Sequence, residues 1–245
     1  MKKLLTSIFA FLLPSFLAVP FLRLLGHRIG KHVRIGFSLL CLSDLELGNS
    51  TRIGHFNLIR NNQCSLGDHC KIGYLNILKG PFDLKLDEYA AIGNKNYLTR
   101  GPAGVTYGES ELHLGTWTKI TVKHHLDLTR SIAFGDYSIL AGLGSQLWTH
   151  GYYHADEGLD RIRIDGPIKV GDNVYVGSSV IFNPGVSVES KIHIGAGTVI
   201  SKNLTKPGMY VNQGLRFIEN DMEKVKSKLR LIEDAMIIEQ VYTKE

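Results

Sequence analysis

Aliphatic residues recur at every sixth position along most of this chain, often with a glycine directly after them. The series opens at Ile29 and Ile35, and from Val170 it runs in strict phase through VGDNVY, VGSSVI, FNPGVS, VESKIH, IGAGTV and ISKNLT. A period of six fits neither the 3.6-residue period of a helix nor one long alternating strand. We therefore predict that each unit is a short strand followed by a turn.

Both the first and the fifth position of a unit suit a protein interior. The fifth position of the cleanest run holds small or β-branched side chains, which are Val174, Val180, Val186, Ile192 and Thr198. A six-residue unit cannot bury its inward side alone, so the units are expected to stack into a solenoid. Three units per coil predict a triangular prism, in which the second-position glycine allows a positive φ in the turn.

Two segments interrupt the repeat, and a third ends it. Thr99–Glu111 is polar and rich in glycine, and residues 151–167 are rich in charge. Insertions in a solenoid form loops, where binding and catalytic groups tend to lie. After Pro207 the apolar spacing predicts an amphipathic C-terminal helix on Met222, Val225, Leu229, Ile232, Met236 and Val241. The predicted organisation is an apolar segment (1–28), a solenoid (29–207) with loops at 99–111 and 151–167, and a C-terminal turn and helix (208–245).

The N-terminal segment is strongly apolar, with Lys2 and Lys3 ahead of an uncharged stretch from Leu4 to Leu22. No small-residue cleavage site follows, which argues against a signal peptide. Two prolines disfavour a continuous spanning helix, although the length is sufficient. We favour a broken apolar helix lying on a membrane surface, with a spanning helix or packing in an oligomer as alternatives. This predicts a cytoplasmic protein bound peripherally to the inner membrane.

The charge and the cysteines narrow the function classes. A net charge of +5 suits an anionic ligand or an anionic membrane surface. The basic residues form none of the runs typical of nucleic-acid binding, so no nucleic-acid partner is expected. The spacing of Cys41, Cys64 and Cys70 predicts reduced thiols rather than disulfides or a zinc finger.

Candidate chemistry gathers where the chain leaves the repeat, in LWTHGYYH (Leu147–His154). Four of the ten histidines, namely His124, His125, His150 and His154, lie near the interruptions. Transfer of an acyl group from a thioester to a hydroxyl needs a base for the proton and a donor for the oxyanion. A neutral histidine suits the first task because its pKa lies near the operating pH.

The six-residue units over residues 29–204 resemble the hexapeptide repeat of the left-handed parallel β-helix acyltransferases. Within that family, Thr149-His150, the polar loop and PIKVGDNVYVGSSVIFNPGV are similar to a segment of the galactoside and maltose acetyltransferase branch. The resemblance implies an all-β solenoid, a left-handed parallel β-helix with an N-terminal apolar helix and a C-terminal amphipathic helix. It also implies that His150 is the general base.

The same resemblance assigns further positions. Ser178 matches a serine near the thioester, and the other residues that match the coenzyme A site are Ala196, Ser201, Lys202 and Arg216. The family's turn before the basic residue is replaced here by VNQGL, so Arg216 departs from the pattern. Candidates for binding a sugar acceptor are Asp127, His124, Trp148 and Tyr152. His124 also suits an inward position, and the two aromatic residues suit either a stacking platform for a sugar or packing of the loop.

Together, these features predict an O-acetyltransferase, and the family resemblance implies that it is a homotrimer. It would move an acetyl group from acetyl-CoA, without a metal, to a hydroxyl of a cell-surface polysaccharide or its lipid-linked intermediate. An N-acetyltransferase of an amino sugar nucleotide or an antibiotic is the alternative within the same class. A γ-class carbonic anhydrase with His124, His150 and His154 as ligands, and a non-catalytic β-helix scaffold, are alternatives from other classes.

Overall fold

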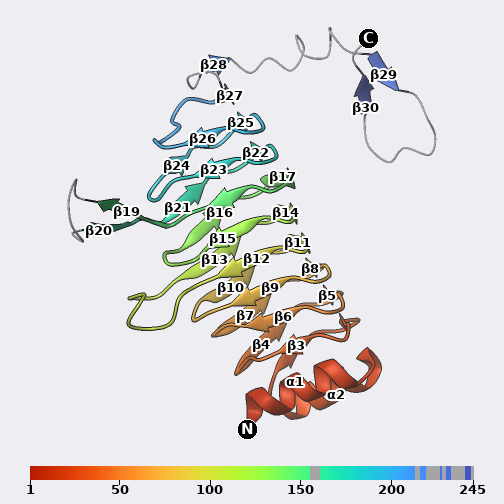
Figure 1. Cartoon of the computed structure of the whole chain (residues 1–245). Coiled ribbons are helices and arrows are strands. Elements are labelled where there is room, and N and C mark those ends of the chain that lie inside the picture. Colours follow the sequence, from red (N-terminus) through yellow and green to blue (C-terminus); the bar gives the residue numbers. More distant parts are fainter. Residues whose placement is uncertain (155–160, 213–215, 219–226, 228–229, 233–240, 244–245) are drawn as a thin grey trace.

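The protein is a three-sided parallel β-solenoid whose N-terminal end is covered by two helices (Figure 1). The computed structural model describes residues 1–154, 161–212, 216–218, 227, 230–232 and 241–243. Strands of each coil pair in parallel with strands of the next, over about nine turns. The predicted solenoid is confirmed, and its left-handed sense stays a prediction.

Three sheets form the faces of the solenoid, and the chain visits them in the order A, B, C in every coil. Sheet A contains β1 (Arg28–Ile29), β4 (Asp44–Leu47), β7 (Gln63–Leu66), β10 (Asp83–Leu86), β13 (Glu111–Leu114), β16 (Ile132–Phe134), β21 (Ile168–Val170) and β24 (Ser187–Val188). Sheet B contains β2 (Arg34–Ile35), β5 (Arg52–Ile53), β8 (Lys71–Ile72), β11 (Ala91–Asn94), β14 (Lys119–Val122), β17 (Ile139–Leu143), β22 (Tyr175–Val176), β25 (Ile192–Ile194), β27 (Gly208–Val211) and β28 (Arg216–Ile218). Sheet C contains β3 (Leu39–Leu40), β6 (Leu58–Arg60), β9 (Ile77–Lys79), β12 (Tyr97–Thr99), β15 (His125–Asp127), β18 (Gln146–Leu147), β23 (Ile181–Phe182) and β26 (Val199–Ile200). We name the edges after the sheets they join, so the C–A edge is where the chain passes from sheet C to sheet A.

The core consists of inward-facing ladders, as the period of six predicts. In the cleanest run the first and fifth side chains are all buried, from Val170 and Val174 to Thr198 and Ile200. Each side chain stacks on its equivalent one coil away, so burial is shared along the whole axis and no single unit is stable alone.

The second-position glycines have a different role from the one predicted. Gly177 does not take a positive φ, whereas Ser179, two residues later, does, at 56°. A Cβ on Gly177 would lie 2.8 Å from the backbone nitrogen of Ala196 in the next coil. The glycine is needed because successive coils approach too closely for a side chain, and not because of its own backbone conformation.

Two short helices occupy the N-terminal segment, where a broken apolar helix was predicted. Helix α1 (Lys2–Leu12) and helix α2 (Ser15–Leu24) are separated at Leu13 and Pro14, and both pack on the first coil. Thr6 and Ser7 are buried against that coil, where the Thr6 hydroxyl lies 2.7 Å from His27 Nε2. We call α1 and α2 the helical cap. Within the described residues, neither helix is long and apolar enough to cross a bilayer.

The predicted C-terminal helix is not confirmed. Where the structure describes this segment, Ile232 lies in β29 (Arg230–Ile232) and Val241 lies in β30 (Val241–Thr243), which pair antiparallel. The other residues of the predicted helix lie outside the described residues. Irregular spacings of three to five residues do not distinguish a helix from short strands by themselves, and this ambiguity explains the difference.

Both interruptions of the repeat leave the solenoid at the C–A edge. The first follows β12, and the second follows β18 and forms an antiparallel hairpin of β19 (His150–His154) and β20 (Arg161–Asp165) (Figure 1). The hairpin begins at the histidine that the sequence singled out. Both insertions therefore lie beside the same edge, although about 50 residues separate them in the chain.

Candidate active site

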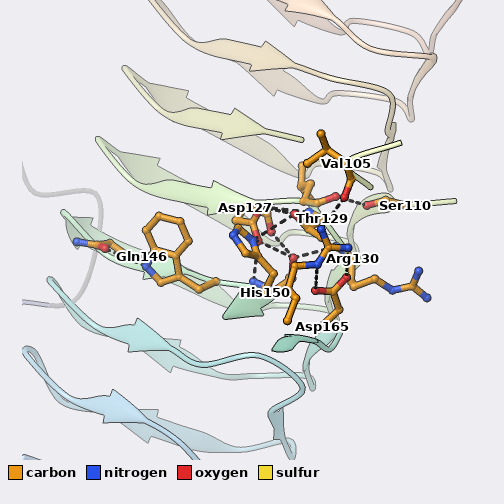
Figure 2. Close-up of polar contacts among 12 residues, drawn as sticks. Val105, Ser110, Asp127, Thr129, Arg130, Gln146, His150 and Asp165 are labelled. Carbon is orange, nitrogen blue, oxygen red and sulfur yellow. Dashed lines mark hydrogen bonds and ion pairs between the residues drawn. The ribbon is translucent and has the colours of Figure 1, made fainter. Parts of the chain in front are cut away.

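A histidine and an aspartate meet at the C–A edge, where the hairpin leaves the solenoid (Figure 2). Asp127 ends β15, and His150 begins β19, one coil further along the axis. The Nδ1 atom of His150 lies 2.8 Å from Oδ2 of Asp127. The imidazole remains 30% exposed, whereas the carboxylate is only 8% exposed.

Two threonines complete the surroundings of the carboxylate. The Thr149 backbone N–H and hydroxyl lie 3.0 and 2.9 Å from Oδ2, and the Thr129 hydroxyl donates to Oδ1 at 2.8 Å. Burial raises the pKa of Asp127, but the hydrogen bonds from His150, Thr129 and Thr149 outweigh it and leave the pKa below its usual value. Asp127 is therefore an anion held in one orientation.

This arrangement determines which imidazole nitrogen is basic. An ionised carboxylate only accepts hydrogen bonds, so in the neutral ring Nδ1 carries the proton and Nε2 carries the lone pair. Asp127 also stabilises the imidazolium that forms when Nε2 takes a proton. The pair has the geometry of a general base with an orienting partner, the chemistry expected for His150.

Asp127 was predicted to bind the acceptor, and the structure favours a different role. Both of its oxygens are occupied by donors from His150, Thr129 and Thr149. A sugar hydroxyl would have to displace one of these buried bonds, at a cost of about 1–3 kcal/mol. We assign Asp127 as the positioning partner of His150.

The two insertions contact each other beside this pair. Arg163 of β20 donates to the carbonyl oxygen of Val105 at 2.5 Å and to Oδ2 of Asp165 at 2.9 Å. Arg130 adds a bond to the carbonyl of Tyr107 and lies over its ring, 4.9 Å from the centroid. The loop that follows β12 and the hairpin thus form one wall next to His150.

Two aromatic rings lie close to His150. The ring of Trp148 lies 6.2 Å from the imidazole and that of Tyr152 lies 6.0 Å away, both edge to face. Trp148 also packs on His125, and its Nε1 donates to Gln146. Tyr152 is half exposed, so it presents a surface to solvent while Trp148 is held by the sheet. The structure thus brings both aromatic candidates to the site.

His124, a second candidate for the acceptor, is inside the solenoid and does not reach the surface. It continues a buried ladder at the B–C edge, because its backbone N–H donates to Asn96 Oδ1 at 2.9 Å, as that of Asn96 does to Asn76 Oδ1. Its Nδ1 accepts from the Ser145 N–H, and burial lowers its pKa to about 4. The inward alternative for a fifth position is the one that the fold adopts.

The residues assigned to the thioester and coenzyme A fall on two edges of the solenoid. Ser178 and Ala196 lie between sheets B and C, whereas Ser201 and Lys202 lie at the C–A edge, two coils beyond His150. Ala196, Ser201 and Lys202 are exposed, and the Ser178 hydroxyl accepts from the Leu143 N–H. Within one chain, Ser178 is therefore not beside His150.

For two further predicted residues, Arg216 and His154, the structure describes the backbone but not the side chain. Arg216 lies in β28, whose backbone pairs with β27, and the placement of its side chain lies outside the described residues. The same holds for the side chain of His154 in β19. For a metal centre, His124 faces the interior and His150 faces the surface, so these two do not converge on one ion.

The comparisons with known proteins agree with this architecture. A family model described as the hexapeptide repeat of succinyl-transferase matches residues 167–202. Galactoside O-acetyltransferase of Escherichia coli is 27% identical over 122 residues. Residues 167–202 thus match the hexapeptide repeat, and the chain is similar to an acetyltransferase over about half of its length. This similarity confirms the resemblance on which the assignments from the sequence rest.

The sequence similarity covers only part of this chain and only part of each relative. The aligned region spans 47% of this chain and 56% of galactoside O-acetyltransferase. A putative acetyltransferase of Staphylococcus aureus is 34% identical over 74 residues, which are 29% of this chain and 36% of that protein. Among solved structures, the polysialic acid O-acetyltransferase OatWY has a TM-score of 0.51 at 16% identity, covering 79% of this chain and 88% of that one. At this identity the structural likeness shows the shared fold.

Two functional contributions were not found from the sequence. Thr129 follows Asp127 by two residues, a spacing at which a hydroxyl can bond back to a carboxylate, and this local signal was available. Arg163 had no such signal, because its contact with Val105 joins two separate insertions.

Proposed function

We propose that this protein transfers an acetyl group from acetyl-CoA to a hydroxyl of a saccharide. The observation that carries the proposal is the Asp127–His150 pair at the edge of the solenoid, with Nδ1 engaged and the ring partly exposed. Galactoside O-acetyltransferase among the relatives favours a sugar hydroxyl as acceptor. Tyr152 supports the same choice, because a half-exposed ring next to the base offers an apolar face to a sugar.

The transfer is direct in this proposal. His150 Nε2 removes the proton as the acceptor oxygen attacks the carbonyl carbon of the thioester. The carbon–sulfur bond then breaks, and the imidazolium returns the proton to the departing thiolate. Asp127 holds the ring and stabilises its positive charge throughout. A backbone amide or Ser178 meets the oxyanion.

A homotrimer would complete this site. His150, Ser201 and Lys202 lie along one edge of the solenoid, and Ser178 and Ala196 lie along another. In a cyclic trimer the C–A edge of one subunit can face the B–C edge of its neighbour, and the contact closes after three copies. Acetyl-CoA would then lie between two subunits, with Lys202 near its phosphates.

Replacement of the base tests the activity. His150→Ala should lower kcat for acetyl transfer by about 100- to 10,000-fold while acetyl-CoA still binds. His113 on sheet A provides a matched control, because its Nε2 lies 2.7 Å from Oδ2 of Asp87 and its side chain is also 30% exposed. His113→Ala should leave kcat within about twofold. Near-normal activity of His150→Ala would falsify the assignment of the base.

We also propose that the helical cap lies on the membrane, because its apolar side faces away from the protein. Exposed side chains on that side include Leu12 (64%), Phe16 (74%) and Leu24 (81%), whereas Thr6, Ser7 and Ala18 face the coil. A helix in water has the opposite arrangement, with hydroxyls outside and large apolar groups inside. Such an inverted pair of helices suits the boundary between lipid headgroups and acyl chains.

The charge around the cap supports an anionic membrane. Residues 1–43 contain no aspartate or glutamate, but they contain Lys2, Lys3, Arg23, Arg28, Lys31 and Arg34. Of these, Lys2 pairs with Asp44 and Arg28 with Glu46, and the other four form no salt bridge with a described residue. Basic residues near an anionic lipid surface each contribute about 1 kcal/mol to binding. The expected location is therefore the surface of an inner membrane, where lipid-linked saccharides are available as acceptors.

Vesicle binding tests the cap. The wild-type protein should sediment with phosphatidylglycerol-containing vesicles, and Phe16→Glu with Leu24→Glu should reduce the bound fraction at least about tenfold. Tyr137→Glu is the control, since Tyr137 is a similarly exposed ring that lies between β16 and β17, far from the cap (Figure 1). If the wild type stays in solution and the cap variants instead abolish self-association, the cap is an interface between copies of this chain.

A further inference from the structure

A basic hollow lies at the C–A edge between the helical cap and the candidate active site. Its volume is about 580 Å³, and no aspartate or glutamate lines it. The cationic side chains are Lys3 from α1, Arg60 from β6, Lys79 from β9 and the buried Arg100. The loop after β12 borders the hollow through Pro102 and Ala103, and the same loop contacts the hairpin that carries His150.

The strand register places the hollow directly in line with the catalytic pair. Arg60 pairs with Lys79, Lys79 pairs with Thr99, and Thr99 pairs with Asp127, so all four occupy one outward column of sheet C. With strands about 4.8 Å apart, Lys79 lies about 10 Å and Arg60 about 14 Å from Asp127 along this column. A ligand held at the two cations can therefore extend a short oligosaccharide to His150.

These cations are not used by the fold. Neither Arg60 nor Lys79 forms a salt bridge with a described residue, and both are exposed. The nearby Asp83 lies beyond the edge on sheet A and accepts from the Gln63 N–H. Like charges on paired positions of neighbouring strands repel each other, so Arg60 beside Lys79 lowers stability unless an anion binds between them.

Arg100 has a separate, structural role. It is buried, and it donates to the carbonyl oxygens of Pro81, Tyr107 and Gly108. These bonds fix the position of the loop after β12, which borders the hollow. Within the described part of the chain, the exposed cations of the hollow that form no salt bridge are Lys3, Arg60 and Lys79, and the last two lie on strands of sheet C.

We propose that this hollow binds the phosphate or diphosphate group that links the acceptor saccharide to its lipid. This inference rests on the proposed acetyl transfer and names the class of acceptor. The helical cap places the end of the hollow that contains Lys3 at the membrane surface. Arg60 and Lys79 then neutralise the phosphate charge, and the saccharide extends along the column of sheet C towards His150. Guanidinium and ammonium groups suit phosphate, and their attraction decreases with ionic strength.

Binding of inorganic pyrophosphate to the full chain tests the hollow without any turnover. Calorimetry should show binding to the wild-type protein that weakens about tenfold in the double variant Arg60→Gln with Lys79→Gln. Lys119→Gln with Lys169→Gln is the control. Lys119 and Lys169 are exposed cations on sheets B and A, away from the hollow. The control should bind as the wild type does.

Kinetics then distinguish the possible sources of the phosphate. With a glycosyl diphosphate acceptor, the Arg60→Gln and Lys79→Gln variant should raise the KM of the acceptor about tenfold, with kcat unchanged. The KM values of acetyl-CoA and of an uncharged glycoside should not change. A higher KM for acetyl-CoA would assign the hollow to coenzyme A, and loss of vesicle binding alone would assign it to lipid headgroups. Either result overturns the proposal, as does equal weakening of pyrophosphate binding in both double variants.

A failure of the proposed transferase activity gives a different pattern. In that case no acceptor is acetylated by any variant, while the difference in pyrophosphate binding between the two double variants persists. Absence of pyrophosphate binding by the wild type would instead refute the hollow, whatever the activity.

Discussion

The buried histidine of the polar ladder should make the solenoid sensitive to acid. In the neutral ring, His124 Nδ1 accepts from the Ser145 N–H at 3.1 Å, and Nε2 can donate to the Thr121 hydroxyl at 2.9 Å. A proton on Nδ1 would place two donors against each other in a site without water access. Burial accordingly lowers the pKa of His124 from 6.5 to about 4.

The sign and size of the effect follow from linkage. Between the two pKa values the unfolded chain binds a proton at His124 and the folded chain does not, so the free energy of unfolding falls as pH falls. The contribution of the neutral His124 ring to the free energy of unfolding is fully present above about pH 6.5. About 3 kcal/mol of this free energy is lost by about pH 4.

His124→Asn removes this titration and keeps the ladder. Asn57, Asn76 and Asn96 already occupy the equivalent position in earlier coils, and each offers its Oδ1 to the backbone N–H of the next coil. Urea unfolding should be measured for both proteins near pH 7 and near pH 4.5. The wild type should lose about 2–3 kcal/mol more than the variant. His27, His125 and His193, whose pKa values burial also lowers, are common to both proteins and cancel in the comparison.

An equal decrease in the free energy of unfolding of the two proteins between neutral and acid pH would refute this account. That result would mean that the interior accommodates the imidazolium, for example by rotation of the Thr121 hydroxyl. A variant that unfolds readily at neutral pH would show instead that the larger ring is needed for packing.

Two further predictions concern the candidate site. Asp127→Asn should lower kcat at least about 100-fold with the KM of acetyl-CoA unchanged, because the ring loses both its orientation and its counter-charge; activity within twofold of the wild type would contradict the pairing. Arg163→Ala should release the loop after β12, so amide hydrogen exchange in residues 101–108 should become about fivefold faster by mass spectrometry. Unchanged exchange there would mean that Arg100 and Arg130 hold the loop without Arg163.

The solenoid could be predicted from the sequence because its information is local and repeated. Val174, Val180 and Val186 each carry the same inward pattern, so many weak signals add up to one unambiguous period. The break at Thr149-His150 was visible for the same reason, since a departure from a strict period is easy to locate. The C-terminal helix was predicted without such repetition, and it is the element that the structure does not confirm.

The roles of individual polar residues were less predictable. Asp127 and His124 lie three residues apart in the sequence, and both looked like acceptor ligands. His124 directly precedes β15 and lies in the interior ladder, whereas Asp127 ends β15 and lies at the C–A edge beside His150. The different roles of His124 and Asp127 depend on the residues that contact them from neighbouring coils. Those residues lie more than 20 positions away in the sequence, so the contacts could not be predicted from local pattern.

The amino-acid sequence by itself determined the coiled architecture and the two insertions, because periodicity and its interruptions act over a few residues. The resemblance to the hexapeptide-repeat acyltransferases then pointed to His150 as the candidate base. Only the tertiary structure decided which partner orients that base, which histidine is structural, and that Arg60 and Lys79 stand in one column with the catalytic pair. Stacking decides these relations, since each coil places residues about 20 positions apart within one strand spacing of each other.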